Sequence, residues 1–136
     1  FVYDRNQIMA ILNQESSLME NVKLIGSDVL PDDQKLTLEI ARVIRLGFLQ
    51  QNAFHQEDTS VPMEKQFLMM ETILYLYEKC RALVNRGMPV SVLKEDKIFE
   101  RIIAIKYEVP NKELERFDEY HKDIDRFYDN VLERNG

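Results

Sequence analysis

Several residue types that build common catalytic and metal sites are scarce in this sequence of 136 residues. Cys80 is the only cysteine, so no internal disulfide can form, and this fits a reducing compartment. The two histidines, His55 and His121, lie far apart, and the four glycines are scattered. The sequence therefore contains no glycine-rich phosphate loop and no paired-histidine motif for a transition metal.

Long apolar runs and an excess of positive charge are also absent. No apolar run approaches the length of a membrane span, so we expect no direct membrane insertion. The net charge of −6 and the lack of a Lys/Arg cluster argue against a nucleic-acid partner. No signal peptide is visible, and because the sequence begins at Phe1 rather than methionine, we expect a fragment of a longer protein.

The residues that are present favour helices, and the clearest helix follows Pro31. Proline suits the first position of a helix, where its missing N–H costs nothing. Asp32 and Asp33 follow in the first turn, where carboxylates favour the helix dipole. Apolar residues then recur at helical spacing, namely Leu36, Ile40, Val43, Ile44 and Gly47. This pattern predicts a helix over about 31–50.

The same reasoning predicts four further helices, at about 4–22, 62–86, 97–107 and 112–134. Gly26 and Gly87 stand where helix-ending glycines belong, and Asn111 is placed to cap the last helix. The predicted buried faces are Ile8, Ile11, Leu12, Leu18, Met19 and Val22; Phe67, Met70, Ile73, Leu74, Tyr77, Cys80 and Val84; Ile98, Ile102 and Ile105; and Leu114, Phe117, Ile124, Phe127 and Val131.

No strand-like alternation persists beyond a few residues. The expected fold class is therefore all-α, with about five helices in a single helical bundle. We expect one domain over residues 1–136, with one longer polar loop at about 51–61.

Candidate chemical residues each have a plain structural interpretation. His55 with Glu57 and Asp58 imitates a metal cluster, but a solvated loop is favoured, because hard carboxylate ligands without a second imidazole suit no tight transition-metal site. His121 is expected to be a packed histidine, and Cys80 a buried, inert thiol. Met69 and Met70 are interpreted as core residues. We predict no catalytic residue and no metal ligand in this chain.

The stretch LPDDQKLTLEIARVIRLGFLQQNAFHQEDTSVPMEKQ, and above all LQQNAF followed by Asp and Val-Pro, resembles the C-terminal domain of the catalytic A subunit (alpha chain) of V/A-type rotary ATPases and ATP synthases. The resemblance implies that the full subunit binds ATP or ADP with Mg at an interface with a B subunit. It also implies ATP hydrolysis or synthesis coupled to proton or sodium translocation. Its expected place is cytoplasmic, peripheral to the membrane. The fragment alone is expected to be monomeric, catalytically inactive and without tight nucleotide binding.

The resemblance also assigns an adenine pocket. It implies that Phe54 packs against the adenine ring and that Glu57 and Ser60 continue the pocket wall, with Ser60 standing where related chains have Tyr or Phe. From the residues alone, an isolated aromatic in a polar loop is favoured as a core anchor instead. The resemblance favours the nucleotide role.

A second set of residues is assigned to a partner. The resemblance implies that Asp28, Leu30, Asp32 and Asp33 face the central stalk of the rotary complex. The alternative is helix capping and dipole compensation alone. Val29, Pro31 and Gln34 interrupt the acidic run, so its charge density is low. For the chain as a whole, the alternative function is a free-standing helical adaptor that binds a partner helix in a groove.

Overall fold

The computed structural model describes residues 2–49 and 63–135, and within these ranges every regular element is helical. The elements in chain order are α1 (Val2–Ile25), η1 (Ser27–Val29), α2 (Asp32–Ile44), η2 (Arg45–Leu49), α3 (Met63–Asn85), α4 (Val90–Leu93), η4 (Lys94–Asp96), α5 (Ile98–Ile103), α6 (Ile105–Glu108), η5 (Leu114–Arg116) and α7 (Phe117–Asn135). The predicted all-α bundle is confirmed. The predictions for Phe54, His55, Glu57, Asp58 and Ser60, and for the loop at 51–61, lie outside the described residues.

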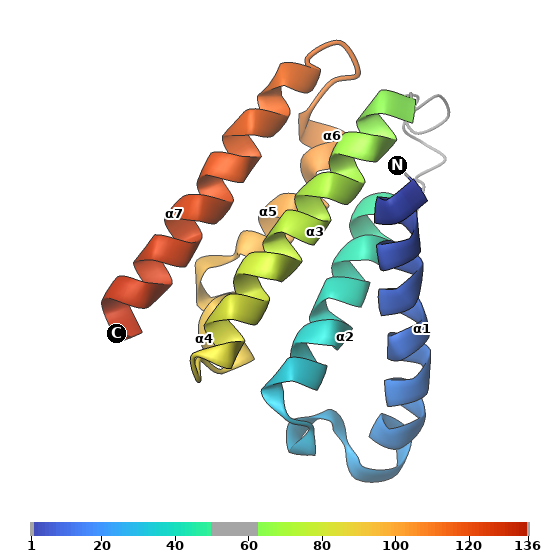
Figure 1. Cartoon of the computed structure of the whole chain (residues 1–136), viewed down its shortest axis with the longest axis vertical. Helices are drawn as coiled ribbons and strands as arrows, with labels where there is room; N and C mark the ends of the chain where they lie inside the picture. Colours follow the sequence, from blue (N-terminus) through green and yellow to red (C-terminus); the bar gives the residue numbers. More distant parts are fainter. Residues whose placement is uncertain (1, 50–62, 136) are drawn as a thin grey trace.

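The helices form a bundle around α3 (Figure 1). Helix α3 contacts α1 and α2 on one side and α7 on the other. The short helices α5 and α6 lie behind α3 in Figure 1, and α5 contacts both α2 and α7. The amino terminus lies near the start of α3, whereas the turn between α1 and α2 lies at the opposite end of the bundle.

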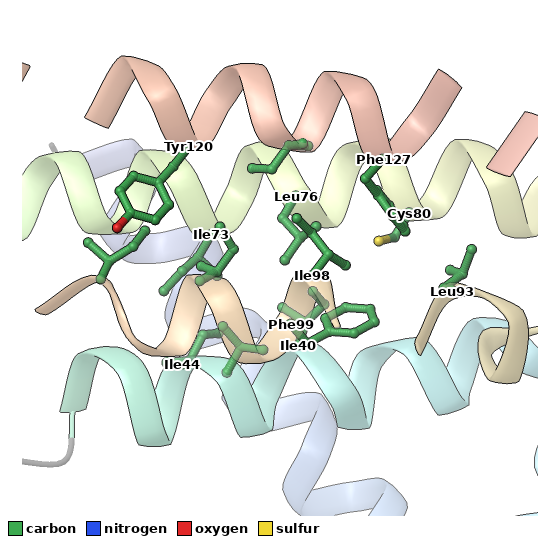
Figure 2. Packing of buried hydrophobic residues seen from close by; sticks show 14 of the residues in the cluster. Ile40, Ile44, Ile73, Leu76, Cys80, Leu93, Ile98, Phe99, Tyr120 and Phe127 are labelled. Carbon is green, nitrogen blue, oxygen red and sulfur yellow. The ribbon is translucent and has the colours of Figure 1, made fainter. Parts of the chain in front are cut away.

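The core is apolar and draws on every long helix. Figure 2 shows members of this core from α2, α3, α5 and α7. Ile40 and Ile44 of α2, Ile73 and Leu76 of α3, and Phe99 of α5 are all 0% exposed. The predicted faces of α2, α5 and α7 are largely confirmed. On α3 the predicted core residues Met69, Met70, Ile73 and Cys80 are buried, whereas Phe67, Leu74, Tyr77 and Val84 are half-buried. Leu76 and Leu83, which were not predicted, are buried as well.

The prediction that Met19 is buried is wrong. Met19 is 41% exposed, because only the first half of α1 turns residues into the core, through Ile8 and Ile11. Two predicted boundaries are also wrong. Pro31 has an extended backbone (φ −65°, ψ 158°) and precedes α2 instead of starting it. Asn111 lies in a turn, with Phe117 beginning α7 only after η5, so it does not cap that helix.

The predicted helix at 97–107 is divided. Lys97 adopts the left-handed conformation (φ 61°) ahead of α5, and Ala104 separates α5 from α6. Between α3 and α5 the chain forms one further helical turn, α4, which begins after Pro89.

Helix α2 continues into the π-helical segment η2, which packs against α5 and α6. A Cβ atom at Gly47 would lie 3.1 Å from the Cα of Ile103, so glycine permits this close backbone approach. Helix α2 has 13 residues and η2 has 5, and η2 extends α2 without a break. The two therefore form one continuous rod, which starts after the α1–α2 turn and ends before segment 50–62.

Candidate functional site

The turn that joins α1 to α2 is the most prominent exposed feature at one end of the bundle. We call residues 24–33 the tip. Helix α1 contains 24 residues, so the tip lies about 35 Å from the amino-terminal end of that helix. In Figure 1 the tip projects beyond the ends of the neighbouring helices.

The backbone of the tip is fixed by local rules. Gly26 ends α1 with φ 86°, a conformation that glycine adopts without strain, and its N–H donates to the carbonyl of Val22 at 2.8 Å. Segment η1 follows at once, and the carbonyl of Pro31 accepts hydrogen bonds from the N–H groups of Gln34 and Lys35, each at 3.0 Å. The chain thus reverses direction in few residues, with these backbone hydrogen bonds holding the turn.

The residues predicted to face a partner take different positions in the tip. Asp28 and Asp33 are exposed, and Asp33 Oδ1 accepts a hydrogen bond from the N–H of Gln34 at 2.9 Å. Asp32 is half-buried, and its Oδ1 accepts from the N–H of Val90 at 3.0 Å, at the first residue of α4. Leu30 is only 7% exposed. The structure gathers all four at one end, but Leu30 and Asp32 also hold the tip against the bundle.

Three exposed apolar residues in the tip were not identified from the sequence. Leu24 is 84% exposed, Ile25 59% and Val29 64%. Helical spacing could not reveal them, because the first helix was expected to end at Val22 and spacing says nothing of side chains in a turn. The sequence does contain one signal that could have revealed them, because three large apolar residues stand within six positions.

A groove of 490 Å³ lies beside the tip, between α1, α2 and α4. Charged side chains paired with one another line its far part. Arg42 Nε donates to Glu39 Oε1 at 2.8 Å, and its Nη2 donates to Glu100 Oε1 at 3.1 Å. Burial lowers the pKa of Arg42, but these two carboxylates outweigh it, so the pKa lies above its ordinary value. Lys94 also lies 3.6 Å from Glu39. These pairs join α2 to η4 and α5.

At the opposite end of the bundle, Lys65 near the start of α3 is 1% exposed. Its Nζ donates to the carbonyls of Val109 at 2.7 Å and Lys106 at 3.3 Å, and to Asn111 Oδ1 at 3.1 Å. A cation here satisfies carbonyl groups that the end of α6 leaves without helical partners. Lys65 is thus a structural link between α3 and α6.

The remaining candidates occupy structural positions. Cys80 is fully buried, and burial, with a smaller effect of Glu39, raises the pKa of its thiol to about 12, as expected for an inert cysteine. His121 is half-buried, with Nε2 3.3 Å from Thr72 Oγ1 and its ring 4.8 Å from that of Tyr75.

Neither a metal-binding cluster nor a membrane-spanning helix is found among residues 2–49 and 63–135. Within these ranges, His, Cys, Asp and Glu form no group suited to a metal ion. None of the helices described there combines the length and the apolar character that crossing a bilayer requires.

Together these features define a class: a helical bundle with a fixed, exposed turn at one end. The family model for the "C-terminal domain of V and A type ATP synthase" matches residues 1–92. The chain belongs to this family.

Named relatives extend the match over nearly the whole chain. V-type ATP synthase alpha chain 2 of Clostridium tetani is 43% identical over 130 residues, which is 96% of this chain and 22% of that protein. The V-type ATP synthase alpha chain of Halothermothrix orenii is also 43% identical, over 129 residues. The A subunit of the A-type ATP synthase of Methanopyrus kandleri is 42% identical over 130 residues. In the latter two, the match covers 95% of this chain and 22% of the relative. The chain thus corresponds to about a fifth of these relatives, in the C-terminal region of the A subunit.

Proposed function

We propose that this domain couples nucleotide binding in the full A subunit to movement of a central stalk. The observation that carries the proposal is the rod formed by α2 and η2. This rod begins at the tip and ends where the chain enters segment 50–62, about 25 Å away at the rise of a helix. A rigid helix of this length would transmit a displacement from one end to the other.

At the nucleotide end, the proposal assigns Phe54 to one face of the adenine ring, with Glu57 and Ser60 beside it. Stacking on an aromatic side chain contributes roughly 1–3 kcal/mol per base in single-strand binders. The phosphates and Mg would be held by other parts of the full subunit, because the described residues offer no phosphate-binding glycine loop.

At the tip end, the proposed partner is the central stalk, and the proposed neighbour of the full subunit is a B subunit. The parent complex would hydrolyse or make ATP and move protons or sodium ions, on the cytoplasmic side and peripheral to the membrane. Family membership supports this interpretation over the free-standing adaptor.

Replacing Phe54 in the full subunit, within its assembled complex, tests the nucleotide role. We expect Phe54→Ala to raise the KM for ATP by roughly tenfold, which corresponds to about 1.4 kcal/mol of lost stacking. Phe54→Tyr keeps an aromatic face and is the matched control, so its KM should stay near that of the parent.

The competing role of Phe54 as a core anchor has a separate readout. A buried phenylalanine would cost roughly 3–5 kcal/mol of stability when cut to alanine. Loss of that size in the melting of the isolated chain, with an unchanged KM in the complex, would replace the nucleotide role by the structural one.

A further inference from the structure

We propose that the tip binds the central stalk through apolar contact, an inference that rests on the proposed function. Leu24, Ile25 and Val29 form the contact surface, and the stalk offers an apolar patch bordered by basic side chains. The acidic residues of the tip stabilise the turn and attract the partner electrostatically, and they contribute little to the affinity of the contact.

The exposure of these three side chains is the first step of the argument. Single exposed apolar residues are ordinary on protein surfaces. Here three large ones, at least 59% exposed, stand within six consecutive positions at a projecting end of the bundle (Figure 1). A concentration of this kind marks an interaction surface.

The tip is also preformed, which lowers the entropy lost on binding. Leu30 is buried, and the carboxylate of Asp32 bonds to the backbone of α4, so both residues fix the turn that carries Val29. Gly26 sets the direction in which the chain leaves Leu24 and Ile25. The apolar side chains are therefore held in one arrangement before a partner arrives.

The acids are poorly suited to supply the strength of the contact. Asp32 is already engaged by the N–H of Val90, and Asp33 by that of Gln34. Asp28 and Asp33 are exposed, and exposed ion pairs contribute little and are screened by salt. Together with Glu20, these two carboxylates outnumber the one positive charge beside them, that of Lys23. The resulting negative charge favours a partner with a basic border and speeds its approach.

The test uses the complete head complex and its purified stalk, with binding measured by titration at low and high salt. One variant carries Leu24→Ser, Ile25→Ser and Val29→Ser. The matched control carries Asp28→Asn and Asp33→Asn. We expect the apolar variant to weaken stalk binding by roughly tenfold or more at both salt concentrations, as loss of buried interface anchors does. The acidic variant should change it by less than about threefold, mainly at low salt.

Two further measurements separate the possible failures. The melting of the isolated chain should be the same for both variants, because all five side chains are exposed. A Ser27→Cys variant, labelled at this exposed position with a thiol-reactive photo-cross-linker, should form a covalent link to the stalk on illumination. Without that cross-link, the proposed function fails together with this inference. A cross-link with strong, salt-sensitive loss only in the acidic variant would overturn the apolar contact alone.

Discussion

Lys65 brings a charged amine into one of the least exposed positions of the described chain. The nearby carbonyls of Lys106 and Val109 and the side chain of Asn111 accept its hydrogen bonds. Nothing in the spacing of apolar residues predicts this, because the acceptors come from a helix end more than forty positions later. The side chain of Asn111, which was expected to cap the last helix, accepts one of these hydrogen bonds instead.

We expect Lys65→Met to destabilise the domain by roughly 1–3 kcal/mol, because methionine keeps much of the side-chain volume but leaves carbonyl groups without their donor. The exposed Lys112→Met is the control and should fall within about 0.5 kcal/mol of the parent. Urea unfolding followed by circular dichroism measures both. Equal stability of the two variants would show that the bonds of Lys65 are not needed.

Tyr120 gives a prediction for alkaline pH. Burial and the hydrogen bond that its hydroxyl donates to Glu108 Oε2, at 2.8 Å, raise the pKa of Tyr120 from 10.0 to about 12. Because the pKa of Tyr120 is higher in the folded state than in the unfolded state, its protonated hydroxyl stabilises the fold. This contribution to the free energy of unfolding is complete below pH 10 and is lost as pH rises toward 12. Between these values the stability of Tyr120→Phe should therefore fall less steeply than that of the parent, as measured by urea unfolding at several pH values. Parallel slopes would contradict the assignment.

At the scale of elements, α2 was predicted best. Its apolar spacing and its acidic first turn agree with the prediction, and the predicted side chains are buried, although Pro31 precedes the helix instead of starting it. The helix expected at 97–107 was predicted least well. Its division depends on the left-handed Lys97 and the break at Ala104, and neither residue type signals such a conformation. Tertiary packing decides both.

The end of α3 supports a prediction at this scale. The N–H of Gly87 donates to the carbonyl of Val84 at 2.9 Å, and that of Met88 to Leu83 at 3.1 Å, which together make a Schellman motif. Gly87 has φ 98°, and no atom lies within 4 Å of an added Cβ. Gly87→Ala should therefore destabilise the domain by about 1 kcal/mol through backbone strain alone.

Arg86→Ala, at the exposed neighbouring residue, is the control and should have little effect on the melting temperature. A Gly87→Ala variant that melts with the parent would show that the turn at this helix end relaxes without cost.

For the whole molecule, the sequence predicted the fold class and the family, but not which tip residues are exposed. The acidic residues 28, 32 and 33 were identified because carboxylates at a helix start are easily recognised. The burial of Leu30 and the exposure of Leu24 depend on how the turn folds back on α4, and helical periodicity contains no information on that.

We expect residues 1–136 to fold as one monomeric, cooperative unit, because buried residues from α1, α2, α3, α5 and α7 belong to one cluster. Circular dichroism should show a mainly helical spectrum and a single melting transition, and sedimentation should give the monomer mass. Two separate transitions, or melting without cooperativity, would contradict a single domain.

The packing of α7 along α3 has a practical consequence for trimming the domain. The family match ends at residue 92, and a chain cut there would lack α5 and α7. The faces of Ile73, Leu76 and Cys80, which now meet those helices in Figure 2, would be open to water. Such a shortened protein should aggregate and be digested rapidly by proteases, since a wide apolar surface invites both. The end of the family-model match is therefore a poor place to cut this domain.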